Sequence, residues 1–247
     1  MCIAAFAFGV NPVRTLVFAA NRDELHTRPT AAADWWPDAP TILGGRDLLA
    51  GGSWLAVDRR GRLAAITNLP QEHPRTFTRS RGSLVRDFLS SDQTAAEFAA
   101  RFAASSADFG PCNLLLWDGA EFLYAATGVG PMRLQAGVHA ISNAPLGADW
   151  PRVHRAQKSF SASLGESQPE TALLEMLSNG AQGAAESADA ALARRRTEIF
   201  ITDAHYGTRS STVIVLSADG HARFFERSFG ADGQASGERS YTFSASA

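Results

Sequence analysis

A cysteine directly follows the first methionine of this 247-residue chain, and its type and position point to nucleophilic chemistry. Small second residues generally permit removal of the initiator, which would leave Cys2 with both a thiol and a free α-amine. A nucleophile with a base in the same residue is a route to covalent catalysis. The α-amine titrates near ~8 and a free thiol near ~8.5, so proton transfer between them is nearly balanced. The competing interpretation is that Cys2 is a small, buried hydrophobic residue at a strand end.

The four adjacent polar residues at 21–24, Asn-Arg-Asp-Glu, end an apolar run and form the second candidate. The apolar runs before them flank a proline-containing turn and predict an antiparallel hairpin. In that hairpin paired positions sum to about 25, so Cys2 lies opposite Arg22 or Asp23. Asp23 would then orient the α-amine, and Arg22 would hold a substrate carboxylate or phosphate. Alternation places these two side chains on opposite faces of the strand, and the competing interpretation is a surface ion pair.

Three further polar residues are candidates on their own positions. Asn68 and Asn143 each end a predicted β-run, where a side-chain amide can donate to a developing oxyanion. Asparagine is also a common turn residue, and this is the competing interpretation for both. Arg209 lies in a hydroxyl-rich segment before an apolar strand, which makes it either an anion clamp or a loop arginine lying over the sheet.

Several classes of function are excluded or disfavoured by composition and motifs. The net charge of −2 argues against a nucleic-acid binder, and no apolar run approaches the ~20 residues of a membrane helix. The histidines and the two cysteines show no metal-ligand spacing, and nucleophile-elbow, Walker A and dinucleotide motifs are missing from the sequence. The low cysteine count favours a reducing compartment, so we expect a cytoplasmic protein without a metal. A single lysine, Lys158, is typical of a GC-rich bacterial genome.

The order of predicted elements favours an α+β fold in one domain spanning residues 1–247, with two mainly antiparallel sheets. Strands are predicted at residues 3–10, 15–20, 53–57, 62–68, 113–117, 121–126, 138–142, 198–202, 211–216 and 222–227. Helices are predicted at residues 83–89, 94–104, 151–164 and 169–177, with Ser91 or Asp92 as N-cap of the second. Loops are predicted at residues 28–40 and, as a loose loop or weak helix, at 179–193, and the tail from about 230 is expected to fray.

Six motifs in sequence order resemble the NRDE family, which includes the transport and Golgi organisation protein 2 homologues. They are Met1-Cys2, Asn21-Arg22-Asp23-Glu24, Gly-Gly-Ser-Trp at 51–54, Thr67-Asn68, Ser142-Asn143-Ala144, and the segment from Tyr206 to Ser211. Together they run from residue 1 to about 215, so the resemblance covers nearly the whole chain.

The resemblance implies an N-terminal nucleophile hydrolase-like fold, a four-layer αββα sandwich. By similarity to cysteine acylases of this fold, it casts Cys2 as nucleophile, its α-amine as base and Asp23 as the group that positions the amine. Asn68 and Asn143 would steady the tetrahedral oxygen. Those acylases carry an arginine a few residues before the aspartate, whereas Arg22 is adjacent to Asp23, which leaves the role of Arg22 open.

Beside Arg22 and Arg209, the matched motifs add Asn21 and Trp54 to the residues expected to bind substrate. The first hypothesis for function is therefore hydrolysis of a linear amide or thioester through Cys2, with no cofactor required.

The alternative is a non-catalytic protein that binds and carries haem or an acyl-CoA or lipid, because the resemblance also implies haem trafficking and lipid metabolism. Cys2, His205 or Tyr206 would then be the axial ligand of a carried haem, and Arg22 or Arg209 would pair with its propionates.

Overall fold

The computed structural model describes residues 2–71, 75–180 and 188–245. The chain divides into two compact units, each built around one antiparallel sheet. The first unit comprises residues 1–28, 136–142 and 146–242, and the second comprises residues 29–135, 143–145 and 243–247. The prediction of an α+β chain with two mainly antiparallel sheets is therefore confirmed.

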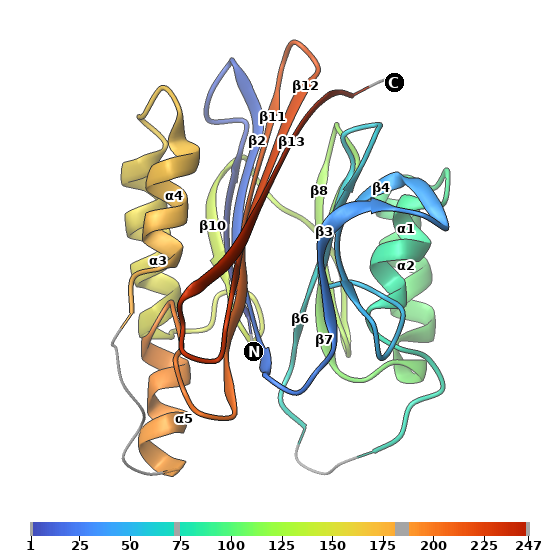
Figure 1. Cartoon of the computed structure of the whole chain (residues 1–247). Helices are drawn as coiled ribbons and strands as arrows, with labels where there is room; N and C mark the ends of the chain where they lie inside the picture. The colour runs from blue at the N-terminus through green and yellow to red at the C-terminus, as the bar shows by residue number, and fades with distance from the viewer. Residues whose placement is uncertain (1, 72–74, 181–187, 246–247) are drawn as a thin grey trace. The chain divides into compact units, whose positions relative to one another are not determined.

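The first unit contains a six-stranded sheet with the order β10-β1-β2-β11-β12-β13. Its strands are β1 (Cys2–Phe8), β2 (Arg14–Leu25), β10 (Gly137–Ile141), β11 (Tyr206–Ser217), β12 (His221–Phe229) and β13 (Ala235–Ser244). Its helices are α3 (Pro151–Ser163), α4 (Pro169–Leu177) and α5 (Ala188–Thr197). Helices α3 and α4 lie side by side against one face of this sheet (Figure 1). The core beneath them alternates along β1, where Ile3, Ala5 and Ala7 face the helices.

The β1–β2 hairpin confirms the predicted pairing, because Cys2 lies opposite Arg22. Both partner strands are longer than the apolar pattern predicts. Strand β2 continues through the polar residues to Leu25, and β11 begins at Tyr206 rather than at Ser211. The two polar extensions pair with each other over the same stretch, which supplies backbone hydrogen bonds that neither would have alone.

The second unit contains a seven-stranded sheet in simple sequential order, from β3 to β9. Its strands are β3 (Thr30–Trp36), β4 (Ala39–Asp47), β5 (Leu55–Asp58), β6 (Leu63–Asn68), β7 (Cys112–Trp117), β8 (Phe122–Ala126) and β9 (Val129–Arg133). Helices α1 (Ser83–Leu89) and α2 (Ala95–Ser105) cover one face of it, followed by the short 3-10 helix η1 (Ser106–Asp108) (Figure 1). No helix of the described residues is long and apolar enough to span a membrane.

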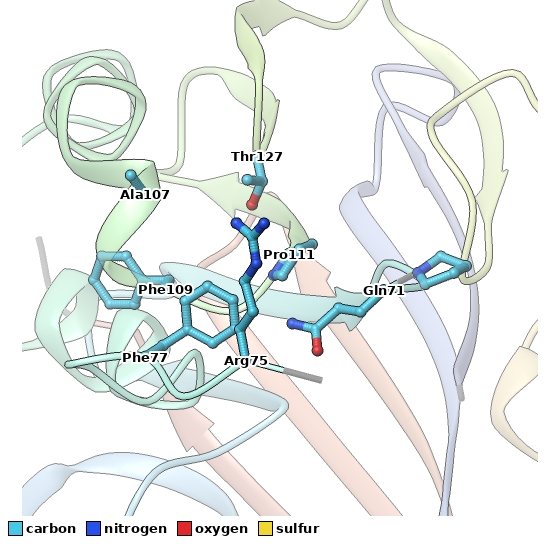
Figure 2. Close-up of a pocket in the computed structure, with 8 residues that line it drawn as sticks. Gln71, Arg75, Phe77, Ala107, Phe109, Pro111 and Thr127 are labelled. Atoms are coloured by element: carbon cyan, nitrogen blue, oxygen red, sulfur yellow. The ribbon is translucent and has the colours of Figure 1, made fainter. Parts of the chain in front are cut away.

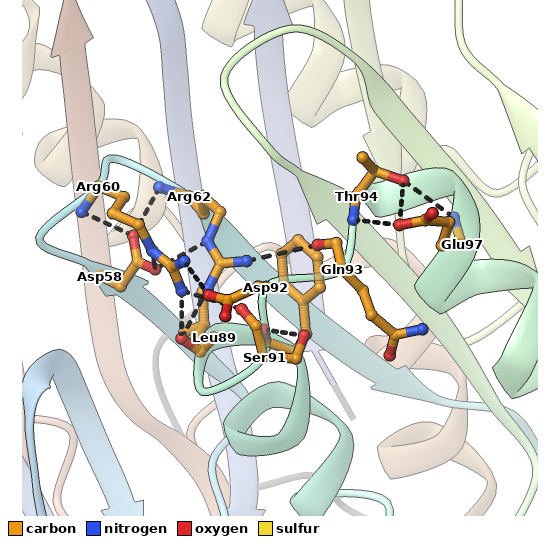
Figure 3. Close-up of polar contacts among 10 residues, drawn as sticks. Asp58, Arg60, Arg62, Leu89, Ser91, Asp92, Gln93, Thr94 and Glu97 are labelled. Atoms are coloured by element: carbon orange, nitrogen blue, oxygen red, sulfur yellow. Dashed lines mark hydrogen bonds and ion pairs between the residues drawn. The ribbon is translucent and has the colours of Figure 1, made fainter. Parts of the chain in front are cut away.

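Four details of the predicted elements were wrong. Residues 28–40, expected to be a loop, contain β3 and the start of β4, while residues 198–202 form no strand. The polar tail forms strand β13 instead of fraying, although it contains few apolar side chains. The N-cap of α2 is Thr94 rather than Ser91 or Asp92, because Thr94 and Glu97 form a reciprocal capping box (Figure 3). Of the stretch 179–193, residues 181–187 lie outside the described residues and 188–193 belong to α5.

Candidate functional site

Cys2, Arg22 and Ser210 form a row across three neighbouring strands of the six-stranded sheet. Cys2 of β1 pairs with Arg22 of β2, which pairs in turn with Ser210 of β11. Residues directly opposite each other in antiparallel strands project from the same face, so these three side chains share one face. Asn21 and Asp23 project from the other face, on which α3 and α4 pack. The polar motif at 21–24 is therefore divided between two surfaces.

Cys2 is a half-buried, free cysteine at the start of β1. Its sulfur accepts a hydrogen bond from the backbone N–H of Asp23, and its carbonyl oxygen accepts one from the Ser142 hydroxyl at 2.8 Å. Burial is the main cause of a raised pKa for the Cys2 thiol, and the negative charge of Asp23 raises this pKa further. The positive charges of the N-terminus and of Arg22 act in the opposite direction. The thiol is consequently protonated at neutral pH and needs a base to become a nucleophile.

The Asp23 carboxylate lies in a buried hydrogen-bond network on the helix side of the sheet. Its Oδ2 faces Nη2 of Arg152 at 3.0 Å, and both side chains are 0% exposed. Its Oδ1 accepts a hydrogen bond from the Thr208 hydroxyl at 2.8 Å, and its backbone oxygen accepts one from the Tyr206 hydroxyl at 2.8 Å. Because the network holds side chain and backbone together, the N–H that contacts the Cys2 sulfur has a fixed position.

Arg152 is a site residue that sequence reasoning missed. Besides contacting Asp23, it donates to the carbonyl oxygen of Arg195 at 2.8 Å. The signal was present in α3, where Arg152, Ala156 and Phe160 follow at intervals of four residues and lie on one buried face. A lone charged residue on an apolar stripe needs a buried counter-charge, and Asp23 supplies it.

Asn21 holds the helical layer against the sheet. Its Nδ2 donates to the carbonyl oxygens of Leu177, at the end of α4, and of Ile199, at 2.8 and 3.0 Å. Its Oδ1 accepts a hydrogen bond from the Ser211 hydroxyl at 2.6 Å. The predicted substrate-binding amide is thus occupied by partners within the protein, so its contribution is to position neighbouring segments.

A β-bulge at Arg209 decides which residues of β11 face the motif. Asp23 pairs with Thr208 and Arg22 with Ser210, so Arg209 is the extra residue between them. The Arg209 guanidinium donates to the carbonyl oxygens of Leu25 and His26 at 3.1 and 3.0 Å. The predicted anion clamp therefore binds backbone carbonyls in this structure.

Ser210 is the second residue that sequence reasoning did not single out. It is 4% exposed, and its hydroxyl has no hydrogen-bond partner among the described residues. Buried hydroxyl groups are nearly always hydrogen-bonded, which makes an unpartnered hydroxyl in the same row as Cys2 a candidate ligand contact. The hydroxyl-rich segment around it carried this signal, although only Arg209 and Tyr206 were singled out from that segment in the sequence.

Asn68, Asn143 and Trp54 lie in the second unit. Asn143 donates through Nδ2 to the backbone oxygen of Asn68 at 2.7 Å, so the two predicted oxyanion donors are direct neighbours. Asn143 also follows Ser142, the residue whose hydroxyl contacts the Cys2 carbonyl oxygen. Trp54 is 9% exposed, and its indole ring covers Gly45 so closely that an added Cβ would clash with it. The indole therefore packs within the second unit.

A family model described as Transport and Golgi organisation 2 matches residues 1–231 of the chain. A Transport and Golgi organization protein 2 homolog from Bos taurus is 34% identical over 256 residues, which cover 92% of this chain and 93% of the relative. The Homo sapiens homolog is 32% identical over 259 residues, with the same two coverages of 92% and 93%. The motif resemblance noted in the sequence is thus confirmed over nearly its whole length.

Two solved structures share the fold at low sequence identity. A Caenorhabditis elegans N-acylethanolamine-hydrolyzing acid amidase ortholog has a TM-score of 0.54 and 13% identity, covering 87% of this chain and 92% of its own. The C2A mutant of a conjugated bile acid hydrolase from Clostridium perfringens has a TM-score of 0.55 and 10% identity, covering 99% and 98%. These similarities confirm the expected N-terminal nucleophile hydrolase-like fold.

Proposed function

The chain belongs to the Transport and Golgi organisation 2 family, and from this premise we propose that it is a cysteine hydrolase that cleaves a linear amide or thioester through Cys2. One observation carries the proposal. The Cys2 sulfur accepts a hydrogen bond from the backbone N–H of Asp23, and the Asp23 carboxylate is paired with the fully buried Arg152. Such a construction fixes a nucleophile in place at a strand end, which covalent catalysis requires.

The proposed reaction begins with removal of Met1, which leaves the α-amine of Cys2 free. The amine takes the thiol proton as the sulfur attacks the substrate carbonyl carbon and forms a C–S bond. The carbon–nitrogen or carbon–sulfur bond of the substrate then breaks, and the proton passes to the leaving amine or thiol. Water, activated by the same α-amine, hydrolyses the resulting thioester and releases the carboxylic acid and the Cys2 thiol.

The other candidates have distinct proposed roles in this reaction. Asp23 acts as a positioning residue for the amine and the sulfur, since its carboxylate is bound to Arg152 and Thr208. Arg22 lies in the same row as Cys2 and is proposed to bind an anionic group of the substrate. Asn68 and Asn143 are proposed to stabilise the tetrahedral oxygen, a contribution of about 3–4 kcal/mol for a well-placed donor.

The names of the two solved structures support hydrolysis of an amide, because both denote hydrolases and one denotes an amidase. We place the reaction in the cytoplasm, where a reducing environment keeps the two cysteines as thiols. No bound metal or cofactor takes part in the steps proposed.

The first experiment measures the intact mass of the purified protein and then screens N-acyl amides and acyl thioesters for hydrolysis. We expect a mass without Met1 and a substrate whose turnover is abolished by Cys2→Ala. The matched control is Cys112→Ala, which removes a buried thiol whose pKa is raised to about 11 by burial. Turnover that survives in Cys2→Ala, or quantitative retention of Met1, would refute the hydrolase.

Retention of Met1 would instead favour the carrier of haem or acyl-CoA, which needs no free amine. Of the candidate axial ligands, Tyr206 already donates its hydroxyl to the Asp23 carbonyl oxygen at 2.8 Å, so a haem would rely on Cys2 or His205. Titration of the Met1-containing protein with haem and with acyl-CoA, followed by absorbance and calorimetry, distinguishes the two cargoes.

A further inference from the structure

A hollow of about 370 Å³ lies in the second unit, between the chain that leaves β6 and the segment that joins α2 to β7. It is lined by Pro70, Gln71, Arg75, Phe77, Ala107, Phe109, Pro111 and Thr127. None of the candidate catalytic residues is among them. The volume is within the range typical of sites for small organic molecules.

The apolar part of the lining includes a fully buried aromatic ring. Phe109 is 1% exposed and packs against Phe102 of α2, with ring centroids 6.0 Å apart. Figure 2 shows the Phe77 and Phe109 rings on one side of the hollow and Pro111 on another. These groups can enclose a flat or aliphatic body without the cost of forming a pocket first.

The loop that carries Phe77 is attached by several contacts to the segment at 107–111, which also lines the hollow. The backbone N–H of Arg79 donates to the carbonyl oxygen of Asp108 at 3.1 Å, and the Arg79 guanidinium lies 4.6 Å from the centre of the Phe109 ring. Arg81 donates through Nη1 to the carbonyl oxygen of Pro111 at 3.1 Å. The hollow is therefore bounded by segments that are tied to each other.

Three arginines line one end of the hollow. A smaller adjoining hollow of about 200 Å³ shares Gln71, Arg75 and Phe77 with the first and adds Arg79 and Arg81 to its lining. None of the described residues that line either hollow is acidic. Asp87, which binds Arg79 at 2.7 Å, lies outside both linings.

Arg75 is the cation best placed to meet a ligand. Its side chain extends into the hollow towards the Thr127 hydroxyl (Figure 2). No ion pair or hydrogen bond joins its guanidinium to the rest of the described residues, in contrast to Arg79 and Arg81. An arginine beside aromatic rings, with no carboxylate partner among the residues that the structure describes, suits a carboxylate or phosphate group.

We propose that this hollow binds a small amphipathic anion, an organic carboxylate or phosphate monoester. The apolar body lies against Phe77, Phe109 and Pro111, and the anionic group binds Arg75 at the positive end. The proposal is independent of the chemistry at Cys2, because it names a binding site in the second unit and no reaction.

The test is isothermal calorimetry with 2-naphthoate, its neutral counterpart 2-naphthalenemethanol, naphthyl phosphate and inorganic phosphate. We expect saturable binding of the organic anions with a Kd below about 1 mM, at least tenfold weaker binding of the alcohol, and no competition by inorganic phosphate alone. The relative affinities of the carboxylate and the phosphate ester identify the preferred anionic group. Binding of the alcohol as tightly as the acid, or displacement by inorganic phosphate, would overturn the amphipathic site.

Two variants and a control locate the binding. Arg75→Gln should lower the affinity for 2-naphthoate at least tenfold while leaving the affinity for the alcohol unchanged, and Phe77→Ala should lower both affinities. Arg133→Gln is the matched control, since it removes an exposed arginine of the same unit that pairs with Glu121, the residue before β8. Circular dichroism confirms that each variant is folded. Wild-type affinity in Arg75→Gln, or no saturable binding to the wild type, would refute the proposal.

Discussion

Replacing Arg152 by methionine is expected to lower the free energy of unfolding by about 3–5 kcal/mol, the usual cost of removing one partner of a buried ion pair. Methionine keeps the apolar stem and similar length, so the change reports on the guanidinium rather than on a large cavity. The wild-type guanidinium lies 3.0 Å from the Asp23 carboxylate and donates to the Arg195 carbonyl oxygen at 2.8 Å. The variant leaves a fully buried carboxylate without its cation, and a domain has only about 5–15 kcal/mol to lose.

The assay is equilibrium unfolding in urea at pH 7, monitored by circular dichroism and tryptophan fluorescence. Arg155→Met is the matched control, because Arg155 is on the same helix, its side chain is 48% exposed and its Glu198 partner is 3.8 Å away. An exposed pair of this kind is worth about 0–1 kcal/mol. The double variant Asp23→Leu with Arg152→Met should be less destabilised than the sum of its single variants by about 2 kcal/mol or more, because neither charge is left unpaired.

If Arg152→Met lowers the free energy of unfolding by less than about 1 kcal/mol, and the slope of that free energy against urea concentration is unchanged, this reasoning is refuted. So would strict additivity in the cycle, since it would mean that the two charges do not interact. The same variant also tests the link to function. If Arg152 positions Asp23, a folded Arg152→Met protein should lose hydrolysis through kcat, with KM little changed.

Three further predictions concern residues outside this pair. Asp58→Asn should lower the free energy of unfolding by about 2–3 kcal/mol, because the Asp58 carboxylate is 1% exposed and accepts hydrogen bonds from the backbone N–H and the Nε–H of Arg62 (Figure 3). A loss below about 1 kcal/mol, measured by unfolding in urea, would contradict this. Ser210→Ala should change the free energy of unfolding by less than about 0.5 kcal/mol but lower kcat/KM for any substrate found, since the Ser210 hydroxyl has no hydrogen-bond partner among the described residues. A large loss of stability with unchanged kinetics would show that Ser210 has a structural role instead. Iodoacetamide should label Cys2 faster as the pH rises towards the raised pKa of its thiol. Cys112, whose pKa is about 11, should stay unlabelled until the protein unfolds. Equal labelling of the two cysteines in the native state, measured by mass spectrometry, would contradict this.

The hairpin at the N-terminus shows what local pattern can predict. The position of a proline-containing turn and two apolar runs were sufficient to place Cys2 opposite Arg22 or Asp23, because register in a hairpin follows from its turn, and the structure pairs it with Arg22. The helices at 83–89 and 169–177 were also predicted at their observed bounds, since each has an apolar stripe and clear ends. These features depend on residues close in sequence.

The features that were missed depend on partners distant in sequence. Arg152 lies 129 residues after Asp23, and neither position identifies the other without the fold. Strand β11 extends through polar residues because β2 offers backbone partners there, and the polar tail forms β13 at the sheet edge for a similar reason. In each case tertiary pairing overrides the apolar pattern on which the prediction relied.

The division of the polar motif between two faces explains why four polar residues can continue a buried strand. Asn21 and Asp23 face the helical layer, where each has its hydrogen-bonding groups bound by side chains or carbonyl oxygens of that unit. A buried polar group that is satisfied costs little, whereas its removal leaves several partners unpaired. Arg22 projects from the other face, in the row with Cys2. Substitution of Asn21 should therefore act through stability, substitution of Asp23 through both stability and kcat, and substitution of Arg22 through the affinity for substrate. One strand thus supplies both the support and the contact surface of the proposed site.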